Sequence, residues 1–186
     1  MPYAVIAILA LFAGQDDKEI DEAIQQFKSA WWKAGRDAGP KAAAVTPLTI
    51  HRHEKILELL LSKLKAEDSP QVKEALVGAV GKYTESEKAA AALVDQLDEN
   101  RKMPNVMQAC FQGLGSLKPA LTRPSVAKVN EFIKHKDMGL AVPAVQALAC
   151  IRHKSSVPPL LDRLRRAQQD MREYIMGQAL KNCDGD

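Results

Sequence analysis

The chain has 186 residues, of which 46% are hydrophobic, 26% are charged and 5% are aromatic. This length and balance indicate one folded domain with a substantial core, and the scarcity of aromatic residues argues against a β-sandwich. Twenty-six basic and 23 acidic side chains leave a net charge of +3, which is too small to indicate nucleic-acid binding by itself.

The sequence starts with a run of ten uncharged apolar residues, from Ala4 to Ala13. This run is too short for a comfortable membrane span, which needs about 20 residues. It fits the central region of a secretory signal peptide, although no basic residue precedes it and no Ala-x-Ala cleavage site is present. Residues 1–14 are therefore predicted to be an export signal, which would place the mature protein in the periplasm or outside the cell. An uncleaved membrane anchor and a buried helix of a cytoplasmic protein are the alternatives.

A first amphipathic helix is expected within residues 16–36, with Asp16 and Asp17 at its N-terminal cap and first turn. Four apolar side chains at helical spacing form one stripe along it: Ile20, Ile24, Phe27 and Trp31. We interpret this segment as a helix that caps the open end of a repeat array. Trp31 is predicted to lie in the core, and Trp32, one step off the stripe, to be half-buried. A position of Trp32 at the edge of a partner surface is the alternative.

A short pattern then returns four times. Each copy opens a helical stretch, at Pro40, Val72, Val106 and Leu140, and has a small residue or proline followed by an aliphatic one seven or eight residues later. The openings are 32 to 34 residues apart, and a fixed period in this range is typical of stacked helical repeats. We expect pairs of helices within about residues 38–68, 69–101, 102–137 and 138–169, and a partial repeat at 170–183.

Local signals place several helix ends. Pro70 and Pro104 suit the first turn of a helix, where a missing N–H has no partner in any case. Thr84 and Glu87 have the spacing of a capping box for the following helix. A longer insertion, from Lys118 to Pro124, separates the two helices of the third repeat.

Small residues recur at one position of the repeat, namely Ala79, Gly113 and Ala147. We expect them to let neighbouring helices approach closely. A larger side chain at such a position would overpack the junction, at a cost of about 1–3 kcal/mol.

Three of the repeats share a motif that identifies a family resemblance. The motifs are Val72-x-x-Ala75-x-x-x-Ala79-Val80, Val106-x-x-Ala109-x-x-x-Gly113-Leu114 and Leu140-x-x-Pro143-x-x-x-Ala147-Leu148. With an aliphatic second helix after each, the chain resembles the HEAT-repeat superfamily in its short bacterial form over about residues 38–183. The resemblance implies an all-α, armadillo-like fold: a right-handed α-solenoid of stacked helical hairpins that serves as a protein-binding scaffold.

Two other repeat families with a similar period fit less well. Tetratricopeptide repeats carry a Trp, Leu-Gly and Tyr pattern that is missing here. The Thr-Pro-Leu-His motif of ankyrin repeats is matched in three letters, by Thr46-Pro47-Leu48, and only once.

Basic residues gather on the second helices of the last two full repeats. They are Lys128, Lys134, Lys136, Arg163, Arg165 and Arg166. In HEAT-like stacks the second helices line the concave surface, so we predict that these side chains contact a partner protein or peptide. A continuous positive stripe would also suit nucleic acid or another polyanion. Glu131 and Asp162 interrupt the positive charge, however, and no aromatic residues alternate with it for base stacking.

We expect no catalytic, cofactor or metal site. His51, His53 and Glu54 lie close together, but side chains two residues apart on a helix face different ways. HEAT-like deoxyhypusine hydroxylase binds iron through repeated His-Glu pairs, and His53-Glu54 is the single such pair in this sequence. No glycine-rich phosphate loop or Gly-x-Ser-x-Gly motif occurs either. An enzyme built on the same scaffold is the alternative.

The three cysteines, Cys110, Cys150 and Cys183, are far apart and include no Cys-x-x-Cys motif. We predict that they are buried as small hydrophobic side chains. A disulfide between neighbouring repeats, joining Cys150 and Cys183, is the alternative.

Overall fold

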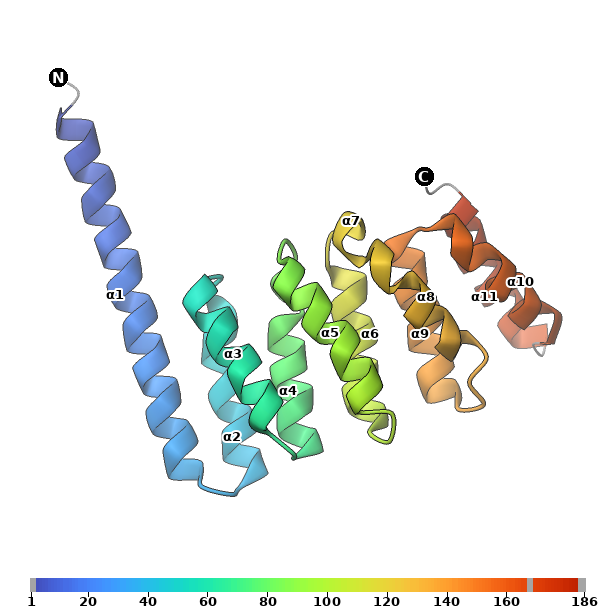
Figure 1. Cartoon of the computed structure of the whole chain (residues 1–186), viewed down its shortest axis with the longest axis horizontal. Coiled ribbons are helices and arrows are strands. Elements are labelled where there is room, and N and C mark those ends of the chain that lie inside the picture. Colours follow the sequence, from blue (N-terminus) through green and yellow to red (C-terminus); the bar gives the residue numbers. More distant parts are fainter. Residues whose placement is uncertain (1–2, 167–168, 184–186) are drawn as a thin grey trace.

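The computed structural model describes residues 3–166 and 169–183, and it describes the side-chain surroundings of residues 17–166 and 172–181. Over these residues the chain consists of α-helices and short 3-10 turns, and no strand occurs in them (Figure 1). The prediction of an all-α fold is confirmed.

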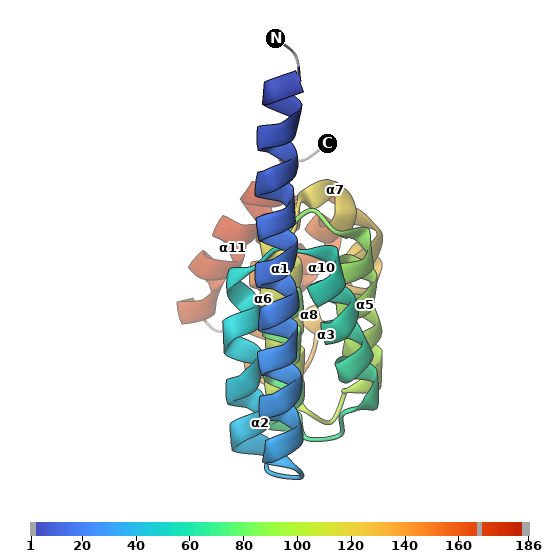
Figure 2. The same cartoon turned by 90° about the vertical axis from the view of Figure 1, so that its left-hand side faces the viewer.

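The first helix, α1, is longer than the sequence predicts. It runs from Tyr3 to Ala34 without a break, so Asp16 and Asp17 lie inside the helix and the prediction that they cap it is wrong. Alanine and leucine, which favour helix, are frequent in the stretch before them, and no proline interrupts it. The N-terminal half of α1 projects beyond the neighbouring helices (Figures 1 and 2). Of the helices that the structure describes, none is long and apolar enough to cross a membrane.

The C-terminal half of α1 packs on α2 (Ala38–Val45) and on η1 (Thr46–Ile50). Ile20, Ile24 and Phe27 are buried there, as predicted. Trp31 is partly buried and packs against the core. Trp32 is 84% exposed, so the prediction of half-burial is wrong. One step along a helix turns the side chain by about 100°, which carries Trp32 off the packed stripe.

The remaining long helices form two layers that advance in chain order (Figure 1). In the first layer, each helix packs on the one before it: α2, α4 (Pro70–Val80), α6 (Pro104–Ser116), α9 (Met138–Ile151) and α11 (Gln169–Cys183). The second layer contains α3 (Glu54–Ala66), α5 (Glu87–Glu99), α8 (Val126–Ile133) and α10 (Val157–Arg166). A view along the row separates α2, α6 and α11 from α3 and α5 (Figure 2).

Each helix of the second layer packs on the helix of the first layer that follows it in the chain. The pairs are α3 with α4, α5 with α6, α8 with α9, and α10 with α11. The predicted repeat boundaries near residues 68, 101 and 137 therefore fall in the turns of the closely packed hairpins. Within a repeat, the two layers are joined by longer connections: η1, residues 81–86, α7 (Pro119–Thr122) with η2 (Arg123–Ser125), and η3 (Lys154–Ser156).

One connected apolar core extends along the row, from Ile20 of α1 to Ala179 of α11. Small residues allow the first-layer helices to approach closely at two junctions. A Cβ built on Gly81 would lie 2.8 Å from the Cα atom of Gly113, and one on Gly115 would lie 3.5 Å from the Cα atom of Ala147. The predicted close approach is confirmed at Gly113, whereas the distance at Ala147 is that of an ordinary van der Waals contact. Ala79 is buried, and its predicted role stays a prediction. The other half of each contact comes from a glycine that the repeat pattern did not identify.

Helix starts are partly as predicted. Pro70 and Pro104 each stand in the first turn of a helix. The predicted capping box at α5 is wrong, because Ser86 is the N-cap and its hydroxyl accepts a hydrogen bond from the Ala89 amide at 3.3 Å. Thr84 lies in the preceding turn, where its carbonyl accepts the Lys118 amide at 2.9 Å and so holds the later insertion against this turn.

Candidate functional site

The structure pairs three of the six predicted partner-binding cations with acidic side chains. The ammonium group of Lys134 lies 2.7 Å from the carboxylate of Asp162, which also contacts Arg166 at 3.3 Å. Lys128 lies 2.5 Å from Asp98 of α5 and 3.4 Å from Glu131. The hydrogen bond from Lys134, with the attraction of Arg166, lowers the pKa of the Asp162 carboxyl group. Lys128 and Lys134 thus help to hold the second-layer helices together, whereas Arg166 pairs within α10.

The other three cations have different surroundings. Arg163 is partly buried, and one of its guanidinium nitrogens lies 2.9 Å from the sulfur of Met138. Lys136, after α8, and Arg165, on α10, are exposed and have no ion pair or hydrogen bond with the part of the chain that the structure describes. The positive charge available to a partner is therefore concentrated at Lys136 and Arg165. The charges of Lys134 and Arg166 are partly neutralised by Asp162.

A regular series of ion pairs joins successive helices, and we call it the carboxylate–lysine ladder. In its first rung, Asp17 and Asp21 of α1 each lie 3.2 Å from Lys55 of α3. In the second rung, the carboxylates of Glu54 and Glu58 of α3 both form ion pairs with the ammonium group of Lys88 of α5. The distance from this group to the Glu58 carboxylate is 3.1 Å. The hydrogen bonds that these lysines donate to the carboxylates raise the pKa of both lysines. The largest contribution comes from the bond to Asp21 in the first rung and from the bond to Glu54 in the second.

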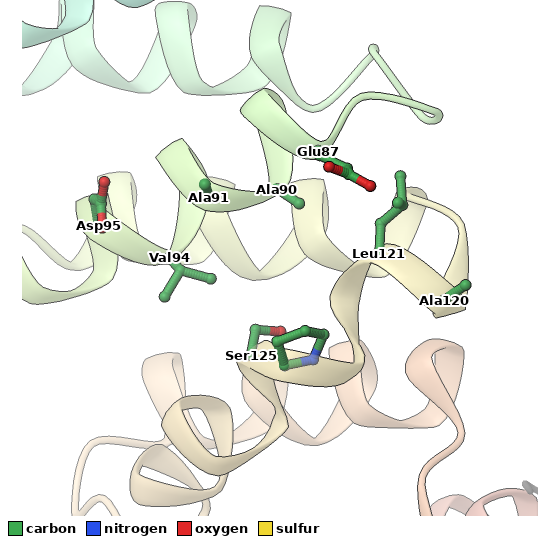
Figure 3. Close-up of a pocket in the computed structure, with 9 residues that line it drawn as sticks. Glu87, Ala90, Ala91, Val94, Asp95, Ala120, Leu121 and Ser125 are labelled. Carbon is green, nitrogen blue, oxygen red and sulfur yellow. The ribbon is translucent and has the colours of Figure 1, made fainter.

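The third rung of the ladder has no lysine. Lys55 and Lys88 are 33 residues apart, and the residue 33 positions after Lys88 is Leu121. The insertion that forms α7 and η2 places Leu121 beside Glu87 of α5 (Figure 3). Glu87 consequently has no ion pair with any described residue, and the same is true of Asp95 on the same helix.

An open cleft of about 440 Å³ occupies this place between α5 and the α7–α8 segment. One wall is a stripe of α5 at spacings of three and four residues: Glu87, Ala90, Ala91, Val94 and Asp95. The opposite wall is formed by Ala120, Leu121, Pro124 and Ser125. Figure 3 shows Val94 pointing toward the wall that carries Ser125, with Glu87 and Asp95 at opposite ends of the α5 stripe.

The cleft combines an apolar floor with negative ends. Val94 and Leu121 are only partly buried, although both pack against the core. Nearby lysines already have partners, because Lys88 is held by the second rung and Lys118 lies 2.7 Å from Glu85. The volume of the cleft lies within the usual range of ligand-binding clefts. This site was not predicted from the sequence, although a helical stripe with an acid at each end next to a predicted insertion was a signal for it.

The histidines have a structural role in helix capping. The ring nitrogen Nδ1 of His53 accepts a hydrogen bond from the Lys55 amide at 3.2 Å, at the N-terminus of α3. His153 does the same for the Ser155 amide, at 3.3 Å, at the start of η3. Among the described side chains, no group of three His, Cys, Asp or Glu residues is placed to hold a metal ion.

The cysteines differ in their surroundings. Cys110 is buried, as predicted, and its burial raises the pKa of its thiol to about 12. Cys150 is an exposed free thiol on the outer face of α9, so the prediction that it is buried is wrong. The side chain of Cys183 lies outside the described residues, and so does the predicted alternative of a Cys150–Cys183 disulfide.

This difference predicts selective thiol chemistry. In a Cys183→Ser variant, an aromatic disulfide reagent should react quickly with Cys150 and with Cys110 only on unfolding, since a buried neutral thiol is unreactive. A Cys150→Ser/Cys183→Ser variant should show no fast phase. The thiol of Cys110 loses its proton more readily in the unfolded chain, so this residue's contribution to stability is complete below about pH 9 and decreases as the pH rises toward 12. Fast labelling of native Cys110 near neutral pH would contradict this assignment.

Comparison with known proteins adds no assignment: no family model, no curated protein and no solved structure matches the chain.

Proposed function

We propose that this chain is a non-catalytic, HEAT-like scaffold that binds another protein or a peptide through its second layer. The observation that carries this proposal is the cleft beside α5, where an apolar floor is exposed between two carboxylates that have no ion pair with a described residue. Exposed apolar surface bordered by polar groups is typical of interaction sites on folded proteins. Such a cleft offers contacts for recognition.

We further propose that the two layers are part of a right-handed α-solenoid. Equivalent contacts recur along the row, which supports this proposal. The close approaches Gly81–Gly113 and Gly115–Ala147 each join residues 32 positions apart, and the capping residues His53 and His153 are 100 positions apart, about three periods. Repetition of a contact at a fixed interval is what a linear array of repeats requires.

The predicted basic residues retain a place in this proposal. Lys136 and Arg165 are exposed and without ion pairs in the described chain, so we assign them the partner contacts at the C-terminal end of the second layer. Lys128 and Lys134 contribute to the contacts between helices, and Arg166 pairs with Asp162 within α10. The second layer would thus present a negative cleft at α5 and positive charge at α10.

We also propose that the protein is exported, with residues 1–14 as the signal. The first buried residue among the described side chains of α1 is Ile20, so the described packing on α2 and η1 would remain after cleavage near residue 14. N-terminal sequencing of the protein recovered from the source cells tests this proposal. A mature protein that still begins at Met1 would contradict it.

Site-specific photocrosslinking in the source cells tests the scaffold role. A photoreactive amino acid at position 91 or 165 of the second layer should give crosslinked protein adducts. The same amino acid at position 74, exposed on α4 of the first layer, should give none. Equal adducts from all three positions would contradict a binding role for the second layer.

A heparin column separates this proposal from polyanion binding. Because Asp162 neutralises part of the positive charge, we expect the chain to elute below physiological ionic strength. Retention above that ionic strength, abolished by Lys136→Glu/Arg165→Glu, would instead favour a polyanion as the partner.

A further inference from the structure

We propose that the cleft beside α5 binds an extended peptide segment with a basic–x–apolar–x–basic pattern, whose cation completes the third rung of the ladder. This inference rests on the proposed scaffold function and names the chemistry of the partner. Its evidence comes from the ladder, from the geometry of the α5 stripe and from the charges around the cleft.

The ladder supplies the first argument. At the two preceding junctions, carboxylates spaced four residues apart hold one lysine from a neighbouring helix, at distances near 3 Å. At the third junction the carboxylate of Glu87 is present, Ala91 stands where the second carboxylate would, and Leu121 stands where the lysine would. Lys128 and Asp98 join α5 and α8 further along the helix and leave Glu87 without an ion pair in the described chain. A lysine or arginine brought by a partner would give Glu87 the kind of partner that Glu54 has in Lys88. The surrounding lysines cannot substitute, because Lys88 and Lys118 are engaged with other carboxylates.

The geometry of α5 sets the spacing of the partner's side chains. Glu87 and Asp95 are eight residues apart on one helix, which corresponds to about 12 Å along its axis. In an extended peptide, residues i, i+2 and i+4 point to the same side, and the first and last are about 13 Å apart. Two basic residues at i and i+4 would therefore reach Glu87 and Asp95, with the apolar residue between them.

The apolar floor of the cleft determines which type of residue fits the middle position of the peptide. Val94 and Leu121 expose apolar surface between the two carboxylates, and Ala90 and Pro124 extend it. A leucine-sized side chain at i+2 would cover this surface and remove it from water. A segment with acidic residues at i and i+4 would be repelled by the same carboxylates, which gives the cleft its selectivity.

Fluorescence anisotropy with a defined probe tests the proposal. The probe is a fluorophore-labelled peptide, blocked at both ends, with the order lysine, serine, leucine, serine, lysine, titrated with the full chain at low ionic strength. We expect saturable binding that weakens when the leucine is replaced by serine and disappears when both lysines are replaced by glutamate. No binding of the original probe would overturn the proposal.

Variants of the protein locate the binding site. Glu87→Gln/Asp95→Asn should weaken binding roughly 2- to 30-fold, the range for the loss of two exposed charge pairs. Leu121→Lys should also weaken it, because an internal lysine would occupy Glu87. Asp68→Asn/Glu74→Gln, which removes two exposed carboxylates away from the cleft, is the matched control and should bind like the wild type. Equal affinity of the cleft variants and the control would overturn the assignment to this cleft.

Three further outcomes are distinguishable. Concentration-dependent dimerisation in sedimentation velocity that is lost in Glu87→Gln/Asp95→Asn would identify a second copy of the chain as the occupant and overturn the peptide proposal. If crosslinks from position 165 persist while the probe fails to bind, the cleft inference fails and the scaffold function stands. If crosslinking fails and the probe binds as expected, the inference about the cleft is supported. The proposed scaffold function of the second layer is then contradicted.

Discussion

Replacing Gly81 with alanine is expected to lower the free energy of unfolding by about 1–3 kcal/mol, although the change adds one methyl group. The new Cβ would lie 2.8 Å from the Cα atom of Gly113. The obstructing atom belongs to the backbone, so no rotation of a side chain can relieve the contact. Helix α4 would have to move away from α6, and the buried side chains between them would lose contact.

Gly78 provides the control because it lies in α4, three residues before Gly81, which is the C-cap of the same helix. It is exposed, and a Cβ added there meets no atom within 4 Å. Alanine should stabilise this position by about 0.5–1 kcal/mol, since it costs less backbone entropy than glycine within a helix. Urea denaturation followed by circular dichroism should therefore show opposite shifts for Gly78→Ala and Gly81→Ala. Equal stability of Gly81→Ala and the wild type would contradict the close approach of α4 and α6.

The local features of the fold could be predicted from sequence because they depend on residues close together in the chain. Pro70 and Pro104 mark helix starts because the ring of proline fixes φ and needs no hydrogen bond there. Gly113 and Ala147 are identified by their recurrence. Their partners Gly81 and Gly115 lie two residues beyond the recurring position of the repeat, and only the relative placement of neighbouring helices shows that they meet.

The surface was harder to predict because its charges depend on contacts between helices. Lys128 looked available to a partner, yet Asp98, 30 residues earlier, neutralises it. The cleft at Glu87 arises because an insertion replaces the expected lysine of the ladder with Leu121. A repeat pattern gives the spacing of such positions along the chain. The distances between their side chains come only from the packing of the two layers.

Replacing Phe111 with alanine is expected to cost about 3–5 kcal/mol, the largest effect of a single substitution that we predict. Phe111 is fully buried in α6 and packs edge-on against Phe132 of α8, with ring centres 5.4 Å apart. Alanine would leave a cavity and remove this aromatic contact between the layers. Phe111→Leu, which keeps most of the volume, should cost less than about 1.5 kcal/mol.

The same variant tests whether the chain unfolds as a linear array. Both tryptophans of the protein, Trp31 and Trp32, lie on α1, which packs on α2 and η1, whereas α6 packs on α4 and α9. Tryptophan fluorescence therefore reports on one end of the row, and circular dichroism reports on all the helices. In an array with interactions between neighbours, a defect in α6 weakens the adjacent repeats most. We expect Phe111→Ala to shift the dichroism transition in urea further than the fluorescence transition, while the two coincide more closely in the wild type. Identical shifts in both signals would contradict the linear array, because they would show that α1 and α6 unfold as one cooperative unit.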